Sequence, residues 1–377
     1  MNVIFTCGGT GGHINPAIAV ANILKERHPD CNILFIGAKG HMEEELVPKA
    51  GYRLETLPGS GMSRGKNLAA LKKNAKAIKC VLDAVSQCKR IIREFKPDVI
   101  IGTGGYASFP ALYAGSLLKV PTCVHEANAV PGLTTKLAAK VADRVLVCFE
   151  ESRKYYKNPG KIEVVGMPIR REFWETDREK ARQELGVGEK PLLVSTFGSQ
   201  GAKAMNEMIA EMFALEQEDG FPMHHIHAVG SFGWKWMPEL VKEKGIDLES
   251  CSSIDMREYV YNMPTVLAAA DIVIGRAGSG TCNEIAATGT PCILIPSPNV
   301  TNNHQEKNAR VLSDNGAAIL LLEKECSAQV VYDQIKSLLA DCEKQKAMRI
   351  ALQKLAVLDS ADRICCILEQ LAAEKRN

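Results

Sequence analysis

The sequence lacks an apolar run of the length that a membrane-spanning helix needs, about 18 residues without charge. Its N-terminus has no basic segment, and the apolar run there is too short for a secretory signal. The formal net charge is only +2, so no overall positive field points to a nucleic-acid partner. We therefore expect no nucleic-acid binding, and a protein that is cytosolic or attaches to a membrane from outside.

Motifs for metals and disulfides are also scarce. No D-x-D sequence occurs, which disfavours a sugar nucleotide held through a metal ion, and no Cys/His cluster has zinc spacing. The 13 cysteines are scattered without a C-x-x-C pair, and only Cys365 and Cys366 are adjacent. Such a set is typical of free thiols in a reducing compartment rather than of a disulfide scaffold. We expect no metal site and no cofactor.

The sequence does have an ordinary globular composition, with 46% hydrophobic and 24% charged residues over 377 positions. This length predicts two domains. Strand-like runs alternate with helix-like stretches, which predicts an α/β protein with parallel sheets. Strands are expected at 2–7, 32–37, 98–102, 121–125, 144–148, 162–165, 192–197, 225–229, 271–275, 291–295 and 317–321. Helices are expected at 15–28, 42–50, 67–95, 177–185 and over 327–374.

The two halves of the chain begin in the same way. In each, an apolar strand leads into a glycine-bearing turn and a helix start, at residues 3–13 and again at residues 192–202. This plan predicts two Rossmann-like halves with a cleft between the carboxyl ends of their sheets. We expect domains over 1–166 and 167–354, with a C-terminal helix at about 355–377 packing back on the first.

Glycine turns at helix N-termini offer backbone N–H groups to an anion. The P-loop pattern is absent, because its only near match, Gly65-Lys66, has Ser60 at the first glycine position. The dinucleotide fingerprint fails because Ile14 stands at its third glycine, which disfavours a nicotinamide or flavin enzyme. We expect a phosphate group at one or more of four turns, at residues 8–13, 102–106, 198–202 and 275–281.

Charge is distributed unevenly despite the small total. Residues 1–169 contain 23 Lys and Arg against 14 Asp and Glu, whereas the remainder contains 23 against 30. The excess is concentrated in residues 62–96, where apolar residues recur at roughly helical spacing. This pattern fits a solvated basic helix that packs one face on the core, and it also fits a surface for anionic lipid headgroups. The apolar residues are Leu68, Leu71, Ile78, Val81, Leu82 and Val85.

Seven motifs follow one another along the chain. They are GGTGGHINP at 8–16, GGYASFP at 104–110, HEAN at 125–128, GMPIR at 166–170, GSQGA at 198–202, RAGSGTCNE at 276–284 and NNHQEKNA at 302–309. Together they resemble glycosyltransferase family 28, in particular its bacterial peptidoglycan N-acetylglucosaminyltransferases. The resemblance implies a two-domain GT-B fold with the nucleotide sugar in the interdomain cleft, and an inverting transfer without a metal.

The resemblance also implies the substrates and the location. The donor would be UDP-GlcNAc, and the acceptor would be the C4 hydroxyl of the MurNAc of lipid I, the undecaprenyl-linked pentapeptide intermediate. The enzyme would sit peripherally on the anionic cytoplasmic face of the cell membrane, near cell-wall synthesis and division proteins. Two alternatives remain open: a related GT-B transferase with another lipid acceptor such as diacylglycerol, and a nucleotide-sugar binding protein without turnover.

Two residues are candidates for the general base. As a neutral imidazole, His13 can take the proton of the acceptor hydroxyl near physiological pH. Glu126 could instead be the base, or it could orient the histidine. A helix-start histidine could also contact only phosphate or the acceptor, so the role of His13 stays open at this point.

The resemblance assigns the nucleotide sugar chiefly to the second half. Ser199 and the helix start at Ser279, Gly280 and Thr281 are expected to donate to the diphosphate, with a charge-assisted bond from Arg170. The carboxylate of Glu284 would accept from both ribose hydroxyls, and the backbone of Val260 would contact uracil. Amides suited to sugar hydroxyls and the acetamido group are Asn128, Gln305 and Asn308, and the first glycine turn adds Thr10, Gly11 and Gly12.

Three positions depart from the family pattern. Ala127 stands where the family usually has Gln, Thr135 where Asn usually precedes Lys136, and Phe197 where the first of two glycines is usual. The first two could touch sugar or acceptor contacts and alter activity. None of the three threatens the fold.

Overall fold

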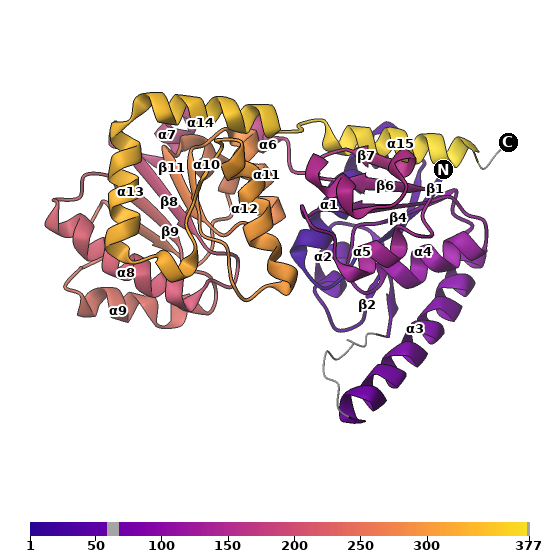
Figure 1. Ribbon diagram of the computed structural model, residues 1–377. Helices are drawn as coiled ribbons and strands as arrows, with labels where there is room; N and C mark the ends of the chain where they lie inside the picture. The colour runs from indigo at the N-terminus through magenta and orange to yellow at the C-terminus, as the bar shows by residue number, and fades with distance from the viewer. Residues whose placement is uncertain (59–67, 375–377) are drawn as a thin grey trace. The chain divides into compact units, whose positions relative to one another are not determined.

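The computed structural model describes residues 1–58 and 68–374, with side chains in the helix that begins at Leu68 described from Lys79 onward. The chain forms two compact α/β units, drawn as ribbons in Figure 1. The first comprises Met1–Ile169 and Asp359–Asn377, and the second comprises Arg170–Leu358. The chain therefore returns to its first unit after completing the second.

A seven-stranded parallel sheet forms the centre of the first unit, in the order β3-β2-β1-β4-β5-β6-β7. Its central strands are continuous apolar runs because helices cover both faces of a parallel sheet. The strands are β1 (Asn2–Thr6), β2 (Asn32–Ala38), β3 (Arg53–Leu57), β4 (Val99–Gly102), β5 (Thr122–Glu126), β6 (Arg144–Val147) and β7 (Ile162–Val164).

Two hydrophobic layers cover this sheet. Val3 and Phe5 of β1 face a cluster that includes residues of α1 and α15, whereas Ile4 faces a cluster with α3 and α4. The last helix, α15, therefore belongs to the core of the first unit, where it packs on α1 (Figure 1). The helices of this unit are α1 (Gly11–Arg27), α2 (Glu43–Lys49), α3 (Leu68–Phe95), α4 (Ser108–Leu117), α5 (Leu133–Ala138) and α15 (Ser360–Glu374), with 3-10 turns η1 (Glu150–Tyr155) and η2 (Pro159–Lys161).

The second unit has a six-stranded parallel sheet in the order β10-β9-β8-β11-β12-β13. Its strands are β8 (Leu192–Thr196), β9 (His224–Ala228), β10 (Ile254–Arg257), β11 (Ile272–Gly275), β12 (Cys292–Leu294) and β13 (Ile319–Leu320). Its helices are α6 (Glu172–Glu175), α7 (Arg178–Leu185), α8 (Lys203–Glu218), α9 (Met237–Glu243), α10 (Met263–Ala269), α11 (Ser279–Thr288), α12 (His304–Asp314), α13 (Ala328–Ala340) and α14 (Cys342–Leu355), with 3-10 turns η3 (Gly233–Lys235), η4 (Thr301–Asn303) and η5 (Glu323–Glu325).

The predicted α/β class with two Rossmann-like parallel sheets is confirmed. The edge strands β3 and β10 were not expected, because each carries charged residues where an edge strand meets solvent. Helix α1 begins at Gly11 rather than at residue 15, since two glycines of low helix propensity hide its first turn. Among the described residues, no helix is long and apolar enough to cross a bilayer. All thirteen cysteines are free thiols.

Candidate functional site

Each sheet has one point where the strand order reverses direction, between β1 and β4 in the first unit and between β8 and β11 in the second. In open α/β sheets, ligands bind beyond the carboxyl ends of the strands at such a point. All four predicted glycine turns follow these four strands. The structure therefore gathers them in two pairs, one pair in each unit.

His13 lies half-buried in the first turn of α1. Its Nδ1 lies 2.9 Å from the carbonyl oxygen of Gly8. Because a carbonyl oxygen can only accept, Nδ1 carries the proton, and Nε2 of the neutral ring keeps its lone pair. The hydroxyl of Thr103 donates to the backbone carbonyl of His13 at 2.7 Å and ties this helix start to β4. This geometry leaves Nε2 as the ring atom that can accept a proton.

The turn after β4 packs directly on this histidine. A Cβ on Gly104 would lie 2.7 Å from Cδ2 of the His13 ring, and one on Gly105 would lie 2.2 Å from the carbonyl oxygen of Gly8. Both glycines also have positive φ, at 110° and 83°. The N–H of Gly104 donates to Ser108 Oγ at 3.2 Å. These glycines therefore serve close packing around His13, and the phosphate expected at one or more glycine turns finds little support here.

Glu43 of α2 is fully buried beneath the first glycine turn. Its Oε1 accepts from the N–H of Gly9 at 3.1 Å and from the N–H of Ala38 at 3.0 Å. The N–H of Gly9 is thus taken by a carboxyl group of the protein itself. A negative charge at this place disfavours a phosphate group next to it.

Glu126 is 4% exposed at the end of β5. Its Oε1 accepts from the backbone N–H and the side-chain amide of Asn128, at 3.0 and 3.1 Å, and its Oε2 accepts from the N–H of Gly132 at 3.2 Å. Both carboxyl oxygens therefore hold the following loop. Of the two base candidates, Glu126 is the more enclosed residue, and its carboxyl group is bonded to Asn128.

The turn after β8 contrasts with the one after β1. Gly198, Ser199 and Gln200 are all exposed. The turn approaches the one after β9 so closely that a Cβ on Gly201 would lie 2.1 Å from the carbonyl oxygen of Val229. The carbonyls of Ser199 and Gln200 accept from Ser231 and Phe232 at 3.2 Å. These bonds hold the turn through its carbonyls while the Ser199 side chain faces solvent.

Helix α11 begins at Ser279, and a Cβ on Gly280 would meet no atom within 4 Å. Its N-cap residue, Gly278, has no side chain that could cap the helix, and the first turn contains no acidic residue. The N–H groups of such a turn carry a partial positive charge. Ser279 is 7% exposed, and Gly280 and Thr281 are half-buried. This helix start offers donors to an anion.

Glu284 lies one turn further along α11 and is half-buried. Burial raises the pKa of its carboxyl group to about 7, and the positive charge of Arg170 opposes that rise. Arg170 is exposed, stacks over the Phe173 ring at 5.4 Å, and has no carboxylate within ion-pair distance in the described part of the chain. The structure thus brings Arg170 close enough to Glu284 in the second unit for its charge to act on that carboxyl group, without an ion pair between them.

The remaining predicted contacts differ in how exposed they are. Val260 is 3% exposed and lies between the exposed Tyr259 and Tyr261, so its contact with uracil stays a prediction. Oε1 of Gln305 accepts from the N–H of Ser297 at 2.9 Å, which aims the other end of the amide away from that loop. Thr10, the N-cap residue of α1, and Gly12 are exposed.

Asn308 is the most enclosed of the predicted amides. It is 0% exposed, and its Nδ2 donates to the carbonyl of Ala277 at 3.1 Å. This bond places the side chain below the α11 turn, and its contact with the sugar stays a prediction.

The departures from the family pattern are also buried. Ala127 is 5% exposed and packs with Cys148 and Met167, and Thr135 is 5% exposed on α5. Phe197 is 4% exposed and lies beneath the guanidinium of Arg276, at 5.9 Å. Substitutions at these three sites change the packing beneath the loops and leave the exposed polar groups in place.

The basic stretch is described only in part. Residues Arg64 and Lys66 and the side chains of Leu68, Leu71, Lys72, Lys73, Lys76 and Ile78 lie outside the described residues. Of the apolar residues in the described part of α3, Val85 packs into the core with Val81 against it, whereas Leu82 is 62% exposed. Lys79, Arg90, Arg93 and Lys96 are exposed, and Lys89 is half-buried. This part of α3 therefore packs one face on the core.

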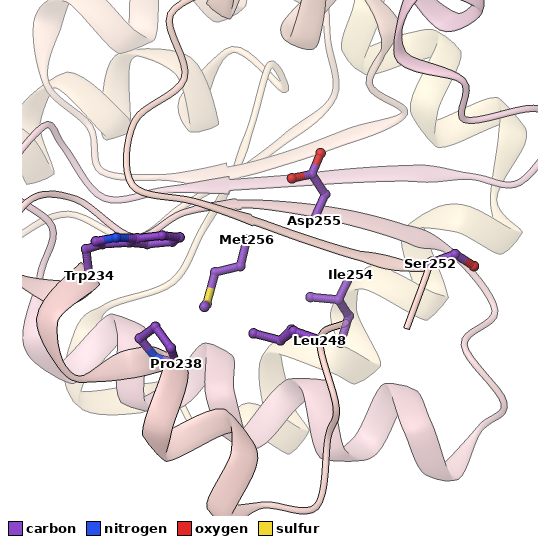
Figure 2. Close-up of a pocket in the computed structure, with 7 residues that line it drawn as sticks. All are labelled: Trp234, Pro238, Leu248, Ser252, Ile254, Asp255 and Met256. Carbon is purple, nitrogen blue, oxygen red and sulfur yellow. The ribbon is translucent and has the colours of Figure 1, made fainter. Parts of the chain in front are cut away.

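A separate hollow of about 530 Å³ lies beside β10 and α9 in the second unit (Figure 2). Trp234, Pro238, Leu248, Ile254 and Met256 point into it, and Ser252 and Asp255 lie at its border. None of the residues predicted to bind the nucleotide lines it. We assign it no part in the site.

Glu43 was missed by sequence reasoning although a signal exists. It stands first of three consecutive glutamates, yet it shares a helix face with Leu46 and Val47, three and four residues later. Glu44 and Glu45 are exposed, whereas Glu43 is buried. A glutamate on the apolar face of a helix is a candidate for a buried polar role.

Comparisons with known proteins agree with the motifs. The model of the glycosyltransferase family 28 N-terminal domain matches residues 3–147, and that of the C-terminal domain matches residues 192–364. A relative from Acetivibrio thermocellus is 38% identical over 100% of this chain and 99% of its own. One from Thermoanaerobacter sp. (strain X514) is 42% identical over 98% of this chain and 100% of its own. Both are named UDP-N-acetylglucosamine--N-acetylmuramyl-(pentapeptide) pyrophosphoryl-undecaprenol N-acetylglucosamine transferase.

Solved structures support the fold. MurG from Acinetobacter baumannii is similar with a TM-score of 0.75 at 24% identity, over 98% of this chain and 99% of its own. A UDP-GlcNAc 2-epimerase from Neisseria meningitidis, bound to UDP-GlcNAc, is similar with a TM-score of 0.66 at 14% identity, over 98% and 100%. Likeness at such identity shows a common two-domain fold and no more.

Proposed function

This chain belongs to glycosyltransferase family 28, and we propose that it transfers GlcNAc from UDP-GlcNAc to the C4 hydroxyl of the MurNAc of lipid I, with inversion at the anomeric carbon. The printed names of full-length relatives describe this donor and this acceptor. The contrast between the two glycine turns is the observation of the site that carries the proposal. One turn holds a proton acceptor, and the other offers anion donors.

The second unit binds the donor. The N-terminus of α11, which has a glycine N-cap and no acidic residue in its first turn, and the exposed Ser199 turn supply hydrogen-bond donors to the diphosphate, and Arg170 supplies a positive charge. Glu284 accepts from the ribose hydroxyls, the backbone of Val260 contacts uracil, and Gln305 contacts the sugar. Together, these groups stabilise the negative charge that develops on the leaving diphosphate.

The first unit binds the acceptor, and His13 moves the proton. Nε2 of His13 takes the proton of the C4 hydroxyl while the hydroxyl oxygen attacks the anomeric carbon of GlcNAc. The bond from that carbon to the phosphate oxygen breaks, and UDP leaves with the electron pair. Asn128, held by Glu126, is placed for the sugar, and Thr10, Gly11 and Gly12 lie at the start of the same helix as His13.

The basic residues of the first unit attach the protein to the anionic cytoplasmic face of the cell membrane, where the lipid acceptor resides. Exposed Lys79, Arg90 and Arg93 of α3 support this role, together with the exposed Leu82. Contact with other proteins of wall synthesis and division would follow from that location.

Turnover of UDP-GlcNAc with a lipid I analogue tests the proposal. We expect transfer to the lipid I analogue and none to diacylglycerol. Transfer to diacylglycerol alone would show that the acceptor is not lipid I. Binding of UDP-GlcNAc without any transfer would contradict the enzymatic role.

A further inference from the structure

We propose that Glu43 is a positioning residue that acts on His13 through the peptide group between Gly8 and Gly9. This inference rests on the proposed role of His13 as general base. The first step is the identity of the peptide group. Its carbonyl, from Gly8, accepts from Nδ1 of His13 at 2.9 Å, and its N–H, from Gly9, donates to Oε1 of Glu43 at 3.1 Å. One planar, polarisable unit therefore joins the imidazole to the carboxyl group.

The second step is the electrostatic effect of this chain. A negative acceptor at the N–H draws the peptide dipole toward it and makes the Gly8 carbonyl oxygen a stronger acceptor. That oxygen then holds the Nδ1 proton more firmly, which fixes the tautomer with Nε2 free. It also stabilises the positive charge that the ring acquires when Nε2 takes a proton. Glu43 thus does through a peptide what a carboxylate does by direct contact in many histidine sites.

The third step is the charge itself. The pKa of the neighbouring Cys7 thiol is raised to about 12, chiefly by burial and in part by the negative charge of Glu43. Oε2 of Glu43 is buried and has no hydrogen-bond partner within the described residues. A neutral amide could accept both N–H bonds without placing a charge in the core. The demands of loop structure alone therefore do not call for a glutamate here.

The surrounding residues hold the chain in place. A Cβ on Gly8 would lie 2.9 Å from Oε1 of Glu43, and one on Gly37 would lie 2.9 Å from its Cβ and Cγ. The Gly105 backbone covers the Gly8 carbonyl from the other side. The carboxyl group is therefore packed closely against this peptide.

The decisive variant is Glu43→Gln, which retains an oxygen acceptor and removes the charge. We expect kcat with a lipid I analogue to fall about three- to thirty-fold with both KM values unchanged, less than the roughly 10²–10⁴-fold loss expected when a base is removed. The acid limb of the rate profile should move to lower pH. Asp143→Asn is the matched control, because Asp143 accepts the N–H of Thr122 at 2.8 Å at the opposite end of the sheet. It should leave both the rate and the pH profile unchanged.

A double variant separates this inference from the role of His13. In a His13→Ala background, Glu43→Gln should lower kcat no further, because its effect passes through the ring. An equal loss in both backgrounds would overturn the relay and leave only a structural role. If His13→Ala alone had nearly normal kcat, the base assignment would fail instead.

A measurement on the unaltered protein keeps the inference testable if Glu43→Gln does not fold. Nitrogen-15 spectra of the histidine side chains report which ring nitrogen carries the proton. We expect His13 in the Nδ1-protonated form in the protein without substrates. A His13 ring protonated at Nε2 would overturn the relay, whatever the activity of any variant.

Discussion

The glycine turn after β1 and the helix start after β11 each lie at the point where the strand order of their sheet reverses, yet their surroundings differ. In the first, the N–H of Gly9 donates to Glu43, and Gly104 and Gly105 pack closely against His13 and Gly8. The second has a glycine N-cap and no acidic residue in its first turn. A glycine turn at a strand end is therefore not by itself an anion site, because neighbouring residues decide whether its donors are available.

The largest expected effect concerns His13, in the turn after β1. His13→Ala should lower kcat by roughly 10²–10⁴-fold, because the acceptor hydroxyl loses its proton acceptor. Binding of UDP, measured by calorimetry, should change little, since the donor groups are in the second unit. Near-normal kcat with a weaker acceptor KM would instead make His13 a binding residue.

Burial of the Glu284 carboxyl group in α11 should have a measurable effect on the stability of the protein. The folded-state pKa of Glu284, about 7, lies above the ordinary value of 4.5, so the folded protein binds more protons between those two pH values. Stability is therefore fully retained below about pH 4.5 and falls as pH rises to about 7. Glu284→Gln should stabilise the ligand-free protein by about 2–3 kcal/mol at pH 8 and hardly at all at pH 4.5. Denaturant unfolding at both pH values measures this, and equal gains at both would refute it.

The same residue sharpens the comparison through the nucleotide. Glu284→Ala should raise the KM for UDP-GlcNAc by about ten- to a hundredfold, as a paired contact worth roughly 1.5–3 kcal/mol disappears. In the unaltered protein, UDP affinity should strengthen as pH rises toward about 7, because the ribose hydroxyls donate to the ionised carboxylate. An unchanged KM in a folded variant would remove the ribose role.

Membrane attachment is expected to depend on the basic residues of the first unit and not on those of the second. Reversal of Lys72, Lys73 and Lys76 should weaken binding to anionic vesicles by about 1 kcal/mol per residue, an effect that high salt should reduce. Turnover of a short soluble acceptor should stay intact. Reversal of Lys242, Lys344 and Lys346, exposed residues of the second unit, is the matched control. If neither salt nor reversal of Lys72, Lys73 and Lys76 changed vesicle binding, the basic face of α3 would be a solvated surface without a role in membrane attachment.

The smallest expected effect is that of metal removal. Activity should survive excess EDTA, because the α11 N-terminus, Ser199 and Arg170 stabilise the negative charge of the diphosphate, as a metal ion would in other enzymes. Loss of activity with EDTA that magnesium restores would show that these groups do not suffice.

Much of this protein could be predicted from its sequence because the signals were local. Continuous apolar runs predicted the central strands, and motif order predicted the family and the positions of all four turns. Edge strands β3 and β10 escaped because their exposed residues break the apolar pattern. The burial of Asn308 escaped prediction for a related reason: an amide in a motif looks the same in the sequence whether it is exposed or buried, and only packing placed it at 0% exposure.

By itself, the sequence determined which segments become strands and where glycine permits a tight turn, since both depend on residues close together in the chain. Only the tertiary structure decided what fills each turn. Gly9 meets Glu43 across 34 residues, and the His13 ring packs on Gly104, which follows β4. Such pairs form only when the sheet brings the carboxyl ends of distant strands together, so the choice between a proton-transfer site and an anion site is a property of the folded chain.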